Sequence, residues 1–154
     1  MRAPFFHEDF VAGQRFVGPV RHAVEADAIK AFAREYDPQP MHTDEAAAAT
    51  GRYGGLIASG WQTAAVTMRL LMSGGLPPIA GGSVGAGVEG LAWPRPVRPG
   101  DVLSVETEVL QTRASRSRPE FGLVKFRART RNQAGEVVQE MTSTLLVPRR
   151  KAEL

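Results

Sequence analysis

The sequence contains no cysteine among its 154 residues. This absence excludes disulfide bonds, a thiolate nucleophile and metal sites built on cysteine. Histidine is also scarce, and His7 and His22 show no metal-ligand spacing relative to His42. We therefore expect neither a metal ion nor a cofactor of the protein's own.

Long apolar stretches are missing as well. No segment approaches the roughly 18 uninterrupted apolar residues that a membrane-spanning helix needs. The first residues, MRAPFFHEDF, reach Glu8 and Asp9 early and lack the apolar core of a signal peptide. From these absences we expect a cytoplasmic protein without a membrane anchor.

Aromatic residues make up only 7% of the chain, whose net charge is +3. The basic residues gather in three stretches: Arg113, Arg116 and Arg118; Lys125, Arg127, Arg129 and Arg131; Arg149, Arg150 and Lys151. Such clusters suit partners that carry phosphate. Because no aromatic residues interleave with them, a stacking platform for nucleic acid is not expected. Length and composition predict one globular domain over residues 1–154, with a loose basic tail at about 148–154.

Helical periodicity is confined to the first half of the chain. It predicts a short amphipathic helix from about Ala26 to Glu35, which Pro38 stops. A second short helix, capped by Thr43, ends at Gly51. The third, Gly60 to Ser73, is the most apolar and is expected to be buried. One of its faces carries Trp61, Ala64, Ala65, Met68 and Met72.

From Ser83 onward the hydrophobic period changes to two, which is typical of half-buried strands. Strands are predicted at about 84–93, 102–110, 124–131 and 137–147, with a shorter one in GQRFVGPVRHAV. Acids of one strand and bases of the next can pair across the sheet. The result is an α+β domain, an antiparallel sheet with one long helix.

The segment YDPQPMH, residues 36–42, is the strongest candidate for chemistry. Asp37 and His42 form a possible acid/base pair. Pro38 and Pro40 lie between them and stiffen the connection. The amide of Gln39 can donate and accept, so it can orient either partner. Taken alone, however, His42 is better explained as a capping or surface histidine.

A second candidate is Ser59-Gly60 at the head of the apolar helix. A helix N-terminus offers free N–H groups, and a glycine there lets a ligand oxygen approach the backbone. Aimed at a carbonyl, this arrangement is an oxyanion hole. An ordinary helix start remains the alternative interpretation.

The stretch Asp37-Pro38-Gln39-Pro40-Met41-His42, followed after five residues by Ala48, resembles the hydratase motif of MaoC-like proteins. These are (R)-specific enoyl-CoA hydratases of the hot-dog fold. The resemblance continues through Gly55 to Gly60 and reaches Pro99-Gly100-Asp101. The sequence departs from the family pattern at four positions: Tyr36, Gln39, Met41 and Ala65.

The resemblance implies one helix wrapped by a curved antiparallel sheet, and a homodimer or larger homo-oligomer. It implies that Asp37 and His42 hold a water over C3 of a trans-2-enoyl-CoA, with Gln39 orienting them. The Gly60 N–H would hold the thioester oxygen. The expected substrate-binding residues are Ser59, Trp61, Arg95, Arg113, Arg116 and Arg118, the arginines facing the coenzyme A phosphates.

Two alternatives stay open. A hot-dog acyl-CoA thioesterase shares the fold, but such enzymes place an acid on or near the central helix, and residues 60–73 contain no Asp or Glu. A non-catalytic acyl-CoA-binding or accessory subunit is the other. The Asp37–His42 pair argues against it, whereas Gln39 and Ala65 leave it possible.

Overall fold

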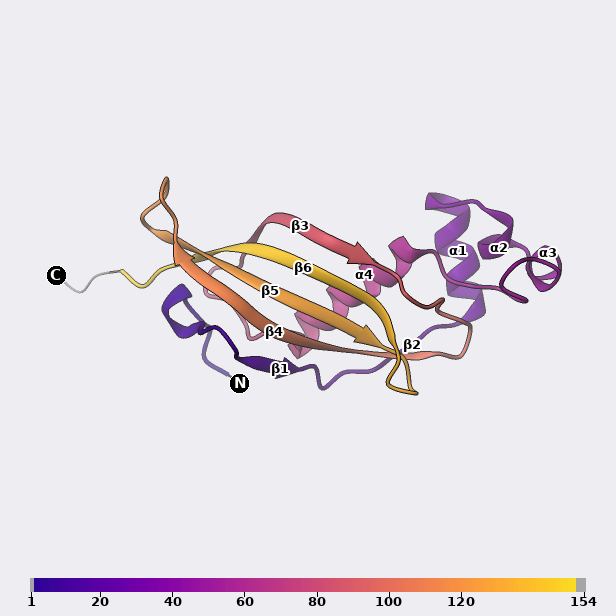
Figure 1. The fold of residues 1–154 in the computed structure, drawn as a ribbon, viewed down its shortest axis with the longest axis horizontal. Helices are drawn as coiled ribbons and strands as arrows, with labels where there is room; N and C mark the ends of the chain where they lie inside the picture. The colour runs from indigo at the N-terminus through magenta and orange to yellow at the C-terminus, as the bar shows by residue number, and fades with distance from the viewer. Residues whose placement is uncertain (1, 152–154) are drawn as a thin grey trace.

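A curved antiparallel sheet is the largest element of the computed structural model, which describes residues 2–151 (Figure 1). Its strand order is β1-β4-β5-β6-β3, and β2 also pairs with β4. The strands are β1 (Arg15–Val17), β2 (His22–Ala23), β3 (Val84–Ala92), β4 (Val102–Ala114), β5 (Phe121–Arg131) and β6 (Val137–Pro148). The predicted strands are confirmed, although β4 extends further than its alternation indicated.

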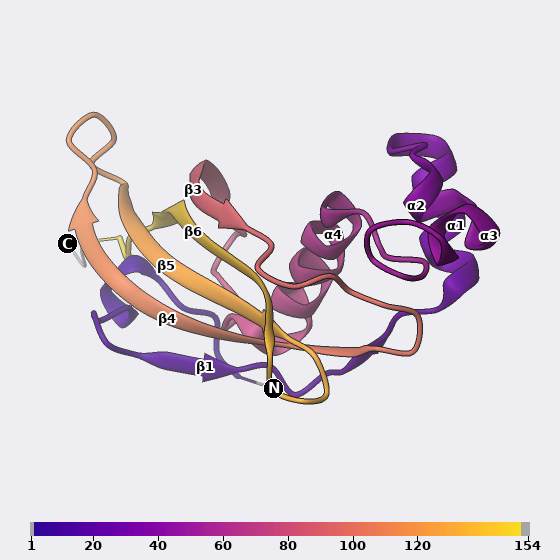
Figure 2. The same ribbon diagram turned by 45° about the vertical axis from the view of Figure 1, so that its right-hand side comes forward.

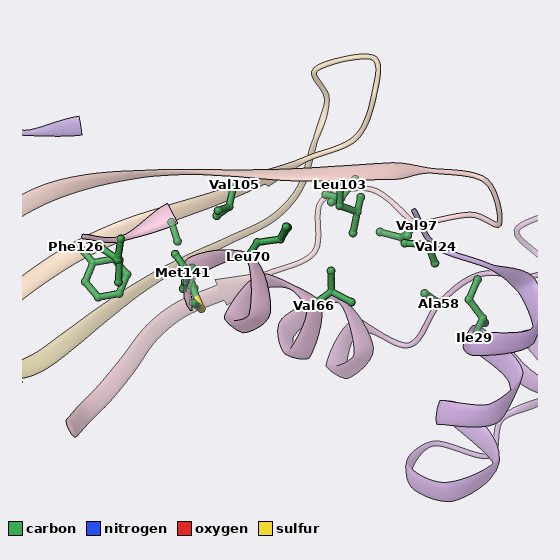
Figure 3. Packing of buried hydrophobic residues seen from close by; sticks show 14 of the residues in the cluster. Val24, Ile29, Ala58, Val66, Leu70, Val97, Leu103, Val105, Phe126 and Met141 are labelled. Carbon is green, nitrogen blue, oxygen red and sulfur yellow. The ribbon is translucent and has the colours of Figure 1, made fainter. Parts of the chain in front are cut away.

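One face of the sheet wraps around the helix α4 (Gly60–Leu70), which continues into a π-helical turn, Leu71–Gly75 (Figure 2). Figure 3 shows Val66 and Leu70 of this helix packed beneath Leu103 and Val105 of β4. Side chains of β5 alternate strictly between buried and half-buried, because successive residues point to opposite faces of the sheet. This confirms the α+β arrangement and the hot-dog fold that the family resemblance implied.

The buried face of α4 differs from the predicted one. Its buried side chains are Gln62, Thr63, Val66, Thr67 and Leu70. Trp61, Met68 and Met72, which were expected inside, are each more than half exposed in the single chain. Thr67 is tolerated in the core because its hydroxyl lies 2.6 Å from that of Thr130 on β5, so that both polar groups are satisfied.

The first half of the chain forms three short helices at one end of the sheet (Figures 1 and 2). They are α1 (Ala26–Tyr36), α2 (Pro40–Thr43) and α3 (Glu45–Ala49), preceded by a 3-10 turn at His7–Asp9. The predicted cap at Thr43 is wrong. Asp44 caps α3 instead, accepting hydrogen bonds from the N–H groups of Ala46 and Ala47. Thr43 closes the separate turn α2, and that turn carries His42.

The charged outer face of the sheet contains the expected cross-strand ion pairs. Arg127 donates to Glu108 at 2.8 Å and Arg129 to Glu140 at 2.7 Å. These exposed pairs stabilise the sheet only modestly, by about 0–1 kcal/mol each. They account for most of the basic ladder on β5 without any ligand.

The chain's basic end is more ordered than expected. Pro148 is still part of β6, while Arg149 pairs with Glu8 and Arg150 with Asp9. The expectation of a loose tail is therefore wrong for residues 148–150, and its last part, 152–154, lies outside the described residues. Within 2–151, no helix combines the length and apolar character needed to cross a bilayer.

Candidate active site

Asp37 and His42 are brought together by a change of direction between α1 and α2. The residue before a proline is pushed out of helical geometry, so α1 ends at Tyr36 and Asp37 takes an extended φ of −152°. Pro40 then opens α2 at a first-turn position where a missing N–H costs nothing. As a result, Oδ2 of Asp37 lies 3.4 Å from Nε2 of His42.

The imidazole of His42 is buried, and its orientation fixes which nitrogen carries a proton. Nδ1 lies 2.7 Å from the carbonyl oxygen of Ile57. A carbonyl can only accept, so Nδ1 donates, and in the neutral ring Nε2 is left with its lone pair. That lone pair and the carboxylate of Asp37 are two acceptors facing one region of space. A group with two O–H donors, such as a water molecule, satisfies both.

Two side chains hold the carboxylate of Asp37 in place. Gln39 Nε2 donates to Oδ1 at 2.7 Å, and Ser59 Oγ donates to Oδ2 at 2.7 Å. These hydrogen bonds, that of Gln39 first, lower the pKa of Asp37 below its ordinary value, against the opposing effect of burial. The nearby His42 lowers it further. The amide of Gln39 therefore orients Asp37 even though the side chain is a methylene longer than the asparagine of the family motif.

Ser59 also begins α4. Its hydroxyl accepts a hydrogen bond from the N–H of Trp61 at 3.3 Å, which confirms the predicted cap. Gly60 is the first residue of the helix, where an N–H has no acceptor within the helix itself. One side chain thus joins the head of the central helix to the carboxylate of the acid/base pair.

Gly60 is covered by an aromatic ring that the sequence did not single out. A Cβ on Gly60 would lie 2.6 Å from the indole of Trp93. The indole N–H donates at 2.8 Å to Oε1 of Gln139, whose side chain is completely buried on β6. Only glycine fits beneath a ring that is anchored in this way. In the sequence, the local feature that could have pointed to this residue is that Trp93 precedes Pro94 at the end of a predicted strand.

A cavity of about 260 Å³ opens next to His42 and Gly60. Its other lining residues are Met41, Tyr53, Ile57, Ala58, Thr63, Trp93, Pro94, Arg95, Pro96, Val97 and Val138. The lining combines apolar walls with few polar groups, which is the usual character of a small-molecule site. Arg95, one of the predicted binding residues, lies in this wall.

Other predicted binding residues are not brought to this cavity. Trp61 is exposed and packs edge-on against Trp93, with ring centroids 5.4 Å apart. Arg113, Arg116 and Arg118 belong to the β4–β5 hairpin, which lies at the opposite end of the sheet from α1, α2 and α3 (Figures 1 and 2). Within one chain these arginines therefore do not reach Asp37 and His42. The order and direction of the strands, which the sequence pattern alone does not specify, decide which end each hairpin occupies.

Comparison with known proteins identifies the family of the chain. The model of the MaoC like domain matches residues 9–130, most of the chain. The chain therefore belongs to the MaoC-like domain family. An uncharacterized Bacillus subtilis protein, YdeM, is 36% identical over 144 residues, which cover 92% of this chain and 98% of the relative.

Solved structures give the same assignment. A MaoC-like dehydratase from Rhodospirillum rubrum is 55% identical and superposes with a TM-score of 0.89, covering 96% of this chain and 99% of the other. The R-hydratase PhaJ1 from Pseudomonas aeruginosa, in its unliganded form, is 27% identical, with a TM-score of 0.74 and coverage of 97% and 92%. The fold and the family are thus those of hydratases and dehydratases.

Replacing Gly60 by alanine tests the packing of Trp93. The added methyl group overlaps the indole, so we expect the G60A variant to lose about 1–3 kcal/mol of unfolding free energy. Urea unfolding monitored by tryptophan fluorescence measures this loss. As a control, G51A adds a methyl that approaches no atom closer than 3.4 Å and should have a much smaller effect. Equal stability of G60A and the wild type would contradict the packing.

The hydrogen bonds to Asp37 make a prediction about pH. The variants S59A and Q39A each remove one donor, so the pKa of Asp37 should rise in both. Carbon NMR titration of the side-chain carboxyl measures it. T43A is the control, because that hydroxyl donates to the carbonyl of Gln39 and not to Asp37. An unchanged pKa in both S59A and Q39A would contradict the assigned contacts.

The same pKa shift affects stability. The folded-state pKa of Asp37 is lower than that of the unfolded chain, about 3.9. Ionised Asp37 therefore stabilises the fold above that value, and its contribution is lost as the pH falls through the folded-state pKa. The variants S59A and Q39A should lose less stability than the wild type over this acidic range.

Proposed function

We propose that the protein adds water reversibly to a trans-2-enoyl thioester, giving an (R)-3-hydroxyacyl thioester, with coenzyme A as the expected carrier. The observation that supports this most directly is the pair of acceptors, Asp37 Oδ2 and His42 Nε2, which lie 3.4 Å apart, with His42 lining a small cavity. A water that donates one hydrogen to each acceptor has its oxygen lone pair free for attack on carbon. The named R-hydratase among the structural neighbours is in line with this reaction class.

The reaction follows from the protonation states of the two groups. Asp37 stays ionised at neutral pH because its pKa is lowered, so it orients the water as an acceptor. His42 Nε2 takes the water proton while the oxygen forms its bond to C3, and the nearby carboxylate attracts the imidazolium charge. The π electrons move to C2 and the thioester oxygen. His42 then returns a proton to C2 on the same face, and the thioester carbonyl re-forms.

The negative charge that forms transiently on the thioester oxygen needs a hydrogen-bond donor. The N–H of Gly60, at the positive end of α4, supplies it in this proposal. Trp93, held by Gln139, packs against Gly60 and leaves room only for glycine at this position. The Ser59 hydroxyl, which donates to Asp37, connects the carboxylate to the N-terminus of α4.

A spectrophotometric assay tests the proposal. Absorbance of the conjugated double bond of a short trans-2-enoyl-CoA should fall when the protein is added, with an (R) product by chiral analysis. D37N and H42A should each lower the rate by about 10²–10⁴-fold without unfolding the protein. D27N, which changes an exposed aspartate of α1, is the matched control.

Each contrary result has a distinct meaning. Wild-type rates in both D37N and H42A would show that the roles are wrongly assigned. Release of free thiol with the double bond of the acyl group left unhydrated would favour the thioesterase, although α4 carries no acid. If no enoyl thioester in a panel of short, long, branched and dicarboxylic chains reacts, the acyl-CoA-binding subunit becomes the better hypothesis.

We also propose that the protein forms a homodimer. β3 is an edge strand, and Val84 and Val88 on it are more than half exposed, as are Trp61, Met68 and Met72 of the α4 segment. An open edge combined with exposed apolar side chains favours pairing with another chain. A second copy of the chain presents the same edge strand and the same apolar side chains. A two-fold arrangement can therefore pair the edges of the two copies and bury their exposed apolar side chains.

Sedimentation equilibrium tests this assembly. The wild type should have twice the mass of one chain, and V88K should shift it toward the monomer by placing charge on the edge strand. V11K, at an equally exposed valine of the N-terminal segment, should remain a dimer. A monomeric wild type at micromolar concentration would contradict the proposal.

A further inference from the structure

Three arginines lie in the wall of the cavity that His42 lines, or next to that wall. Arg95 and Tyr53 both line the cavity. Arg52 and Arg98 both contact Tyr53, as described below. We call Arg52, Arg95 and Arg98 the rim arginines. They come from two loops, residues 50–58 and 93–101, that lie toward the α1–α3 end of the sheet (Figure 2).

The rim is held in position by specific contacts. Nη2 of Arg98 donates to the carbonyl oxygen of Tyr53 at 2.7 Å, which ties one loop to the other. The backbone N–H of Arg98 donates to Asp101 at 2.8 Å. The guanidinium of Arg52 lies over the ring of Tyr53, 5.7 Å from its centroid. Such preorganised cations lose little conformational entropy when an anion binds.

Charge at the rim is also poorly compensated. Arg127 and Arg129 on the sheet each contact a glutamate, whereas among residues 2–151 no carboxylate oxygen lies within 4.0 Å of the side-chain nitrogens of Arg52 or Arg98. Arg95 pairs with Glu136 at 2.8 Å, and its side chain remains more than half exposed. The guanidinium groups of the rim arginines are therefore available to bind an anion.

We propose that the rim arginines bind phosphate of the phosphopantetheine arm that carries the acyl group, an inference that rests on the proposed thioester substrate. The guanidinium fork matches phosphate geometry and forms strong, charge-assisted hydrogen bonds. If the thioester end of the substrate occupies the cavity, the carrier can extend past Arg95 and Tyr53 in its wall, next to Arg52 and Arg98. The hairpin residues Arg113, Arg116 and Arg118 are at the other end of the same chain.

Calorimetric titration with free coenzyme A tests the rim without requiring any reaction. The variants R52Q and R98Q should each weaken binding about tenfold, which is the typical effect of losing a hydrogen bond to a charged group. Binding of pantetheine, which has no phosphate, should be unchanged. R69Q removes an exposed arginine of α4 and is the matched control. R98K, which keeps the charge but loses the fork, should fall between R98Q and the wild type.

A third ligand, 4′-phosphopantetheine, distinguishes the source of the phosphate. If R52Q weakens its binding as much as that of coenzyme A, the arm phosphate is the group recognised, and a carrier-protein thioester also fits. If only coenzyme A is affected, the rim binds its nucleotide phosphates, and the proposal that it binds the arm phosphate is wrong.

The proposal is wrong if R52Q and R98Q bind coenzyme A like the wild type, or if pantetheine binding falls equally. Loss of binding in R116Q, with the rim variants unaffected, would also overturn it. Free coenzyme A binds without being turned over, so the binding test is independent of the hydration assay. The proposal for the rim arginines can therefore fail while the proposed reaction is supported, and the reverse can also occur. If R98Q does not fold, R52Q alone still tests the proposal. Arg52 contacts the exposed ring of Tyr53, so its replacement should not affect folding.

Discussion

The carboxylate of Asp37 is the contact on which the arrangement of the site depends. It accepts hydrogen bonds from Gln39 and Ser59 and lies beside His42, so it joins the end of α1, the turn α2 and the head of α4. Asp37 thus links the helical segment to the central helix, and in the proposed reaction it also orients the water. An ionised carboxylate suits both roles, and the two donors that position it also favour the ionised form.

The wall opposite this carboxylate is built on a different principle. Gln139 is buried on β6 and fixes the indole of Trp93, which in turn leaves room only for glycine at position 60. One hydrogen bond to the sheet therefore fixes the ring that covers the first residue of α4. In the proposed reaction the acid/base pair and the oxyanion-binding backbone come from separate parts of the fold, and Ser59 contacts both.

The sequence predicted the parts of this structure that depend on local pattern. Strict alternation located β5, and the proline-bounded segment identified Asp37, Gln39 and His42 together. The buried face of α4 was predicted wrongly, because Thr67 is buried only through its partner Thr130, more than sixty residues later in the chain. A hydrophobic pattern cannot reveal a hydroxyl that is satisfied across such a separation.

Two of the three rim arginines, Arg52 and Arg98, escaped prediction for a related reason, whereas Arg95 was predicted. Arg52 and Arg98 meet at Tyr53 because two loops far apart in the sequence lie side by side, and neither loop has a pattern that points to the other. The hairpin arginines formed the more obvious cluster in the sequence, yet the course of β4 and β5 carries them to the far end of the sheet. Clustering along the chain thus gave the wrong location for positive charge near the site.

The central claim is that one pair of side chains, on one face of the substrate, both activates the water and returns the proton. Hydration of a trans-2-enoyl thioester in heavy water, followed by NMR of the 3-hydroxyacyl product, tests it most directly. The account predicts a single deuterium at C2 on the same face as the new hydroxyl at C3. Deuterium on the opposite face, or scrambled between the two faces, would contradict it.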